Sequence, residues 1–341
     1  MVKYNKTVTS WAFYDFANSA FTTLLVTFIY GAYFAQSICP NDILGTQLWS
    51  WSISITAIIV AISSPLLGVV ADIGGYRKVI MMISTWLCIL LTAFLFFPEP
   101  GDFIFAIILF TIANIAFEIG TVFYNAYLPE IAPKNHIGRV SGFAWGLGYL
   151  GGLVALLIAL IFFIQPDKPV FGLTTFDGQN IRATNLLVAV WFFLFSLPFF
   201  IFIKDDRLNK KMDNNLFKAS FKRLKSTFIE IKKYKNIYRF LIARLVYNDA
   251  LITIFAFGGI YASTVIGFSF NEIILMGIVL NLTAGLGAYS IGFIDDRKGS
   301  VFVIRSSVLA LLIACFLALI APNIILISSF VSIIPDWIDP K

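Results

Sequence analysis

Charged residues are scarce in this chain: Asp, Glu, Lys and Arg make up 13% of its 341 residues, whereas a soluble domain carries about 25%. Hydrophobic residues make up 59%. Because a soluble fold cannot hide that much apolar surface, we expect it to face lipid. The amino-terminal run MVKYNKTVTSW lacks the short apolar core and cleavage site of a removable signal. The composition therefore predicts an integral membrane protein, with the lipid bilayer as a partner.

Cysteine and histidine are equally rare. Cys39, Cys88 and Cys315 lie far apart, so we expect neither a disulfide framework nor a CxxC metal site. The single histidine, His136, lies in a basic loop and is interpreted as a surface residue, which argues against an intramembrane metalloenzyme or a histidine-dependent hydrolase. A GxxxxGK[ST] phosphate loop, which an ATP-driven pump needs, is absent. We predict no enzymatic activity, no metal and no cofactor.

Long apolar runs are what the sequence does contain. A spanning helix needs about 20 predominantly apolar residues, since its backbone must satisfy its own hydrogen bonds in hydrocarbon. Nine segments meet this length, and they predict an all-α polytopic fold. They cover residues 11–36, 48–71, 79–97, 103–128, 140–164, 185–203, 240–264, 272–294 and 301–320.

Lysine and arginine are placed between the apolar runs, so membrane topology explains the net charge of +6 and we exclude nucleic acid as a partner. With the amino terminus inside, the cytoplasmic tail and loops hold 21 of the 25 basic residues. The external loops hold only Lys168 and Arg182. Because positive charge is retained on the cytoplasmic side, we predict a cytoplasmic amino terminus in a bacterial inner membrane.

The only long charged stretch predicts the domain organisation. Residues 215–237 place apolar residues at spacings of three and four between lysines, which is typical of an interfacial helix; a solvated linker is the alternative. We therefore predict an amino-terminal six-helix lobe over residues 1–203, a basic linker over 204–239 and a second lobe over 240–341.

A short motif occurs twice, at equivalent places in the two lobes. GVVADIGGYRK places Gly68, Asp72 and Gly75 between the second and third spans. GFIDDRKG places Gly292, Asp296 and Gly299 at the same spacing between the eighth and ninth. Glycines permit a tight turn and close helix approach, while the aspartate can pair with basic residues across the loop. The repetition predicts two related halves, as in parallel-repeat transporters.

This loop spacing resembles the signature loop of the major facilitator superfamily. Five further motifs resemble its vacuolar amino-acid effluxer-like branch: WAFYDFANSAF at 11–21, YNAYLPEIAP at 124–133, GRVSGFAWGLGYLGG at 138–152, ARLVYNDALITIFAFGGIYA at 243–262 and NLTAGLGA at 281–288. The resemblance implies twelve spans in two six-helix lobes around a central cavity. It also implies gradient-driven movement of small solutes such as amino acids, with protons as a candidate coupling ion.

The sequence departs from that pattern after the ninth span. Only residues 324–334 are apolar there, and eleven residues cannot cross a bilayer. Two alternatives to a transporter therefore stay open: a truncated remnant that inserts without transporting, and one half of a split system. A channel is a weaker alternative, because the polar residues form clusters and no continuous stripe.

Charged and polar residues inside the spans are candidates for substrate or proton binding, because charge in a bilayer is costly. Asp15 and Asn18 lie near the predicted cytoplasmic start of the first span, and Asn114 and Glu118 share one face of the fourth. The seventh span carries a repeat-related group. The full set is Asp15, Asn18, Asn114, Glu118, Arg244, Asn248 and Asp249. The alternative for Asp15, Arg244 and Asp249 is a structural ion pair at the interface.

A separate charged group is predicted to gate the cytoplasmic side. Such loops resemble the charge-paired latch that holds the outward-facing state in this superfamily, and solvated surface charge is the alternative. The group comprises Gly68, Asp72, Gly75, Arg77, Glu130, Arg139 and Asp296. Five glycines between Gly142 and Gly152 predict close packing of the fifth span. Trp11 and Trp49 lie near span ends and predict an interfacial belt. The oligomeric state is not predicted.

Overall fold

The computed structural model describes residues 6–166, 169–204, 226, 229–230, 233–268 and 270–321. Within those ranges the chain is helical and contains no strand. Most of the predicted basic linker and all of residues 322–341 lie outside the described residues, and so does most of the predicted interfacial helix over residues 215–237.

The long helices match the predicted spans within several residues at each end. The first span is a composite of α1 (Lys6–Ala20), the π-helix η1 (Phe21–Phe28), α2 (Tyr30–Tyr33) and η2 (Phe34–Ile38). The other first-lobe elements are α3 (Asp42–Gly74), α4 (Arg77–Phe94), α5 (Phe103–Ala126), α6 (Leu128–Ile131), α7 (Ile137–Ile158) continued by η4 (Ala159–Ile164), and α8 (Gln179–Phe202), with the short 3-10 helices η3 (Lys134–His136), η5 (Val170–Gly172) and η6 (Phe176–Gly178) between them. The second lobe holds α10 (Lys235–Tyr261), η7 (Ala262–Ile266), α11 (Phe270–Lys298) and α12 (Ser300–Ile320).

Among the described residues, eight helices are long and apolar enough to cross a membrane. The predicted seventh span coincides with α10 and η7, which are not among the eight. The structure does not describe several side chains of these two elements. The outward faces are apolar, as lipid requires: Ile55, Ile58 and Ile62 project from α3, and Leu312 and Phe316 project from α12. The fold is therefore a helical membrane bundle.

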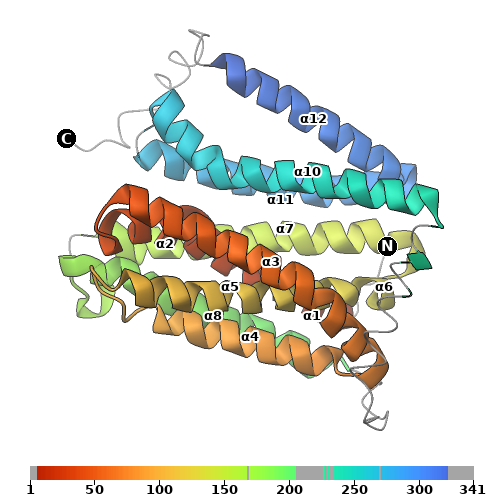
Figure 1. Cartoon of the computed structure of the whole chain (residues 1–341), viewed down its shortest axis with the longest axis horizontal. Helices are drawn as coiled ribbons and strands as arrows, with labels where there is room; N and C mark the ends of the chain where they lie inside the picture. Colours follow the sequence, from red (N-terminus) through yellow and green to blue (C-terminus); the bar gives the residue numbers. More distant parts are fainter. Residues whose placement is uncertain are drawn as a thin grey trace.

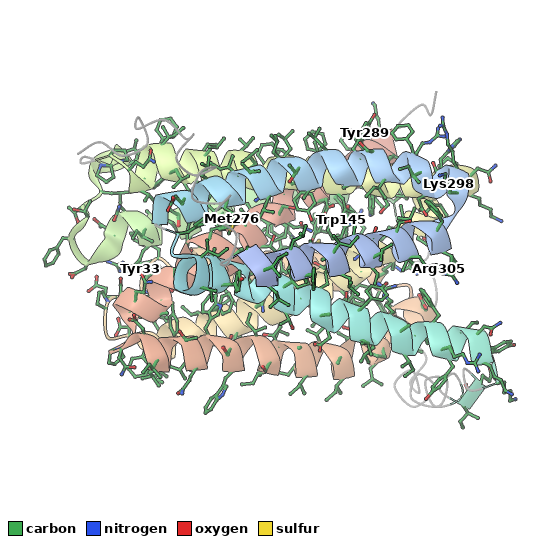
Figure 2. The ribbon with its side chains drawn as sticks, turned by 90° about the horizontal axis from the view of Figure 1, so that it is seen from above. Tyr33, Trp145, Met276, Tyr289, Lys298 and Arg305 are labelled. Atoms are coloured by element: carbon green, nitrogen blue, oxygen red, sulfur yellow. The ribbon has the colours of Figure 1, made fainter. Side chains whose placement is uncertain are left out.

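The helices run side by side along the long axis of the molecule (Figure 1). The first lobe packs α1 against α7 and α8, and α5 against α3 and α4. The helices α10, α11 and α12 lie in a layer on one side of this bundle, and α11 packs along α7. Figure 2 shows this layer from above, with Tyr33 and Met276 toward one end and Lys298 and Arg305 toward the other.

Aromatic rings fill the first-lobe core. The Tyr14 hydroxyl hydrogen-bonds with Thr85 Oγ1 at 2.8 Å, and its ring packs on Tyr124 and Phe199, so this side chain joins α1, α4, α5 and α8. Trp11 is 1% exposed and donates from Nε1 to the Tyr124 carbonyl oxygen at 3.0 Å. The predicted interfacial position of Trp11 is therefore wrong, because the indole finds its hydrogen-bond partner inside the bundle.

Glycines give α7 two contact faces. A methyl group added at Gly142 would lie 2.5 Å from the Ala288 carbonyl oxygen of α11, and one at Gly146 would lie 3.2 Å from that of Gly285. Turned toward the other side, Gly148 and Gly152 leave room for α1. The predicted close packing is thus observed, and α7 packs along α11 over much of its length.

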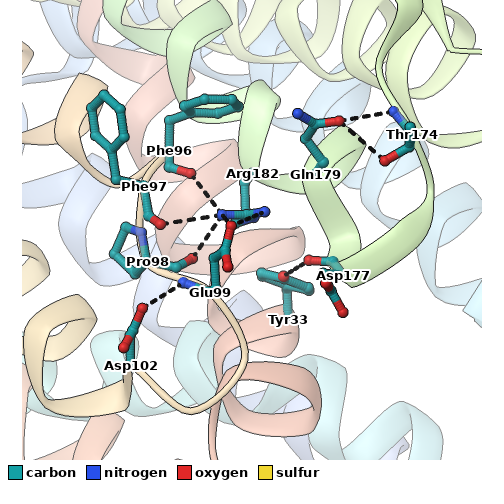
Figure 3. Close-up of polar contacts among 10 residues, drawn as sticks. All are labelled: Tyr33, Phe96, Phe97, Pro98, Glu99, Asp102, Thr174, Asp177, Gln179 and Arg182. Atoms are coloured by element: carbon teal, nitrogen blue, oxygen red, sulfur yellow. Dashed lines mark hydrogen bonds and ion pairs between the residues drawn. The ribbon is translucent and has the colours of Figure 1, made fainter.

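The bundle has two ends. The basic end consists of residues 72–78, 128–139, 203–204 and 295–300, and ion pairs and hydrogen bonds connect these segments. The opposite end consists of residues 38–42, 95–102 and 170–182. At the opposite end, Arg182 lies in the first turn of α8, not in a loop, and it is 5% exposed. Its guanidinium donates to three main-chain carbonyls after α4 and pairs with Glu99 at 3.4 Å (Figure 3).

Candidate transport site and gate

Asp15 lies beside the middle of α7, deeper than the sequence predicts. On its own span, Lys6–Ile38, it follows the first residue by nine positions, about 13.5 Å at the helical rise of 1.5 Å per residue. Its carboxylate lies against Gly148, at the midpoint of the span Lys134–Ile164. The alternative of an interfacial ion pair fits this depth poorly.

Polar groups surround Asp15, but cations do not. A methyl group at Gly148 would meet Ser19 Oγ at 2.8 Å and Asp15 Oδ2 at 3.3 Å, so both side chains share this surface of α7. Asn18 is buried and lies one turn along α1 from Asp15. In the described part of the chain, no Lys, Arg or His lies within ion-pair distance of Asp15. The site is a half-buried carboxylate with hydrogen-bonding neighbours.

Glu118 occupies a similar depth on α5. It lies near the middle of the span Phe103–Ile131 and is half-buried, without a charged neighbour among the described residues. Asn114, one turn earlier, is 5% exposed. The helices that carry the two acids meet through rings, because Phe21 of η1 stacks on Phe117 at 4.6 Å. Among the described residues, two carboxylates without an ion-pair partner therefore lie on neighbouring helices, each beside or near the middle of a span.

The second-lobe candidates are placed differently. Arg244, Asn248 and Asp249 are exposed on α10. Over the residues that the structure describes, no hydrogen bond or ion pair connects them with Asp15 or Glu118. Tyr261, near the far end of α10, donates to the Ala318 carbonyl oxygen of α12 at 2.6 Å. The structure therefore places Asp15 and Glu118 on helices in ring contact, with no ion pair or hydrogen bond between the two acids in the described part of the chain, and leaves Arg244, Asn248 and Asp249 apart from both.

At the basic end, Arg77 binds two of the predicted gate residues. Its guanidinium lies 3.0 Å from Asp72 and 2.8 Å from Glu130, which joins the end of α3, the start of α4 and α6. Gly75 has a φ of 74°, a left-handed turn that glycine adopts without strain. Nothing lies within 4 Å of a methyl group added at Gly68. This half of the predicted gate is a contact within the first lobe.

The other half of the predicted gate is a contact between lobes. Asp296, at the end of α11 and with a side chain 4% exposed, lies 2.9 Å from Arg139 Nε and accepts from the Gly138 amide at 3.0 Å. Both groups belong to the first turn of α7, where free amides and the helix dipole favour an anion. A methyl group at Gly292 would lie 2.6 Å from the Gly138 carbonyl oxygen. The two copies of the motif thus have different partners.

Ser19 lies one turn from Asp15 and belongs to the same polar cluster that the sequence shows at the start of the first span. Two further residues were not predicted as candidates. His136 Nδ1 lies 3.7 Å from Asp296 Oδ2, not on an isolated surface loop. Tyr149 lies against Gly285 of α11, which no sequence pattern indicates. A shallow hollow of about 440 Å³ over Asp42–Trp51 contains none of the predicted residues.

The helical membrane bundle, with its glycine and aspartate loop in two copies, is that of a membrane transporter of the major facilitator type. A solved structure of that class, the proton:xylose symporter XylE bound to 6-bromo-6-deoxy-D-glucose, superposes with a TM-score of 0.58 at 13% identity, covering 86% of this chain and 69% of that one. The sequence profile described as "Vacuole effluxer Atg22 like" matches residues 48–324, and this chain belongs to that family.

Relatives come from bacteria and fungi. The MFS-type transporter YxiO of Bacillus subtilis, described as uncharacterized, is 24% identical over 93% of this chain and 74% of its own length. Autophagy-related protein 22 of Yarrowia lipolytica is 22% identical over 76% of this chain and 55% of its own length. Autophagy-related protein 22-1 of Neosartorya fischeri is 22% identical over 52% of this chain and 29% of its own length. The chain thus spans about three quarters of the bacterial relative and about half or less of the fungal ones.

Proposed function

We propose that this chain is a secondary active transporter of small solutes, amino acids or similar metabolites, that works by alternating access. One observation carries the proposal: the Asp15 carboxylate lies against Gly148, at the middle of the span Lys134–Ile164, and among the described residues no cation lies within ion-pair distance of it. An unpaired charge there costs at least about 2.5–3.5 kcal/mol, and a proton or a cationic substrate group would remove most of that cost. Transporters of related architecture bind their substrates near the bilayer midplane.

The remaining candidates take supporting roles. Glu118 offers a second exchangeable proton at the same depth, and Asn18 and Asn114 offer hydrogen bonds. Arg244 would contact a substrate carboxylate or a neighbouring acid, with Asn248 and Asp249 beside it on α10. The position of α10 as the repeat counterpart of α1 supports this assignment.

The basic end would close the path on the cytoplasmic side. The Arg77 and Asp296 contacts support a gate there, since each ties together different helices. The excess of lysine and arginine supports a cytoplasmic amino terminus. The Bacillus relative supports a bacterial inner membrane.

Reconstitution tests the proposal directly. The full chain is purified, placed in liposomes and loaded with a panel of radiolabelled amino acids under an imposed proton gradient. We expect gradient-dependent flux of at least one compound, and a loss of at least tenfold with Asp15→Asn. Asp42→Asn, at the exposed start of α3, is the matched control. Flux equal to that of empty liposomes, or an Asp15→Asn protein as active as the parent, would overturn the proposal.

A further inference from the structure

The lobe contact at the basic end concentrates negative charge. Asp295 and Asp296, near the end of α11, both reach the first turn of α7: a methyl group added at Gly138 would lie 2.6 Å from Asp295 Oδ2 and 2.8 Å from Asp296 Oδ1. Arg139 Nε lies 2.9 Å from Asp296, and among the described residues Asp295 forms no ion pair. The two carboxylates therefore share one arginine, which leaves one negative charge without compensation.

His136 lies beside this surplus charge. Its Nδ1 is 3.7 Å from Asp296 Oδ2, and its side chain is 36% exposed, whereas the Asp296 side chain is 4% exposed. His136 Nδ1, Asp296 Oδ2 and Arg139 Nε are buried atoms for which the described structure contains no aligned hydrogen bond. The imidazole is therefore in contact with solvent, where it can exchange a proton, and also adjacent to a buried carboxylate.

The charge of a histidine changes near neutral pH. An imidazole ordinarily titrates between pH 5 and 8. A protonated ring carries an N–H donor on each nitrogen, so it always presents a donor to Asp296, whereas a neutral ring carries only one N–H. With His136 protonated, the two aspartates are balanced by two cations. With the ring neutral, they are balanced by Arg139 alone.

Other charged groups on the elements around His136 are paired or exposed. On α6, Glu130 pairs with Arg77 at 2.8 Å. Arg139 lies 5.0 Å from the centre of the Phe293 ring, and arginine keeps its charge throughout this pH range. The exposed cations of η3 and α11, which solvent screens, are Lys134, Arg297 and Lys298. His136 is the single histidine of the chain, so it is the imidazole that can change the charge of this contact.

We propose that His136 is a proton sensor for the lobe contact at the basic end: its protonated ring binds Asp296 and holds α7 against α11, and its neutral ring releases that attraction. A cation beside buried carboxylates strengthens the contact. The contact is therefore tightest below the pH range in which the ring titrates, and it weakens as pH rises through that range. This inference rests on the gate of the proposed function and adds its regulation, since transport should slow when the basic end faces an acidic compartment.

The lobe contact can be measured directly, without a substrate. The full chain carries spin labels at Lys204, directly after α8, and at Ser300, the start of α12; both are exposed at the basic end, and Cys315 is replaced by serine. In nanodiscs both faces meet the same buffer, and the distance distribution is recorded from about pH 5.5 to about pH 8. We expect the population with separated lobes to rise about two- to fivefold across this range, the fold-change of a partly exposed ion pair.

Two substitutions at His136 have opposite expected results. His136→Gln keeps a polar side chain that cannot be protonated, so the separated population should stay at the parent's high-pH level at every pH. His136→Lys keeps a positive charge, so the population should stay at the parent's low-pH level. The matched control is Lys134→Gln, which removes an exposed charge two residues away and should leave the pH response of the parent.

A parent protein without a pH response, or a response in His136→Gln equal to that of the parent, would overturn the inference. Asp296→Asn separates this failure from that of the proposed gate. If the lobes separate in Asp296→Asn while His136→Gln keeps the pH response, the gate stands and the sensor is wrong. If Asp296→Asn leaves the lobes closed, the gate itself fails. Size-exclusion profiles establish folding, and should His136→Gln misfold, His136→Lys decides, with a response like the parent's as the contrary result.

Discussion

At the scale of single residues, Arg182 shows how main-chain oxygens stabilise a buried cation. It donates to the carbonyl oxygens of Phe96, Phe97 and Pro98 at 3.2–3.3 Å. These carbonyls follow the end of α4, where backbone acceptors lack helical partners and the helix dipole is negative. Glu99 adds an ion pair from an exposed position, so the carbonyls provide most of the buried compensation.

Replacing Arg182 by Gln should therefore destabilise the first lobe. Hydrogen bonds to a charged group contribute about 1.5–3 kcal/mol, and the freed carbonyls stay buried. We expect a lower Tm for Arg182→Gln in detergent, followed by a fluorescent thiol or size-exclusion assay. Arg305→Gln is the control, because Arg305 is exposed on α12. An unchanged Tm for Arg182→Gln would show that the network contributes no stability.

Glu118 can be tested as a proton carrier separately from Asp15. Glu118→Gln keeps the shape of the side chain and removes its proton exchange. If Glu118 couples transport to the gradient, proton-driven uptake should fall at least tenfold, while exchange of labelled for unlabelled substrate continues. Identical rates and pH dependence for Glu118→Gln and the parent would remove Glu118 from the mechanism.

Sequence patterns identified polar residues in the spans but could not place them. Asp15 was expected near the first span's cytoplasmic start, yet the span begins earlier and Gly148 fixes the carboxylate at mid-depth. Arg182 was expected in a loop, and Trp11 at the interface, but both are buried. Hydropathy averages over a window of residues, whereas these placements depend on a partner far away in the chain.

At the scale of helices, the two copies of the repeated motif offer a matched pair of substitutions. A methyl group at Gly292 would lie 2.6 Å from a backbone oxygen of α7, and backbone cannot move aside cheaply. A methyl group at Gly68 would meet nothing. Gly292→Ala should therefore push α11 from α7 and destabilise the protein by about 1–3 kcal/mol, while Gly68→Ala should be neutral or slightly stabilising.

Thermal unfolding of the two purified variants checks this prediction, with transport of the same substrate as a second measurement. Both substitutions make the same chemical change in a helix, so intrinsic helix propensity cancels between them. Equal Tm values for Gly292→Ala and Gly68→Ala would mean that the α7–α11 contact contributes little to stability.

Helix positions were more predictable than helix geometry. Apolar length locates a span by itself, and the described helices agree with the predicted spans within several residues. The π-helical turns were not predicted, because they depend on local hydrogen bonds such as that from Thr27 Oγ1 to the Thr22 carbonyl oxygen. Such turns are frequent at functional sites, and η1 begins two residues after Ser19.

At the scale of the whole molecule, the repeat predicted two equivalent loops but not their different partners. Asp72 pairs with Arg77 inside the first lobe, whereas Asp296 pairs with Arg139 across the lobes. The similarity of the two motifs shows only that the glycines and the aspartate have the same spacing. It does not show which surface each loop faces, because that depends on how the two lobes pack.

This difference predicts that the two aspartates affect lobe separation unequally. Asp296→Asn removes the charge that Arg139 and the first turn of α7 bind, a loss of about 1.5–3 kcal/mol at the lobe contact. A bias of that size shifts a two-state equilibrium about tenfold or more toward separation at the basic end. Asp72→Asn removes an equivalent charge inside one lobe and should not shift it.

Spin labels at Lys134 and Lys298, exposed residues at the basic end on opposite lobes, measure the shift as a distance distribution. Cys315 is replaced by serine, while Cys39 and Cys88 are buried and should not react. We expect a new long-distance population in Asp296→Asn alone. If Asp72→Asn opens the lobes equally, the gate acts through overall charge at that end and not through the contact at α7. If neither variant differs from the parent, other contacts along α7 and α11 hold the lobes together, and the close backbone contacts at Gly142 and Gly292 are the first to examine.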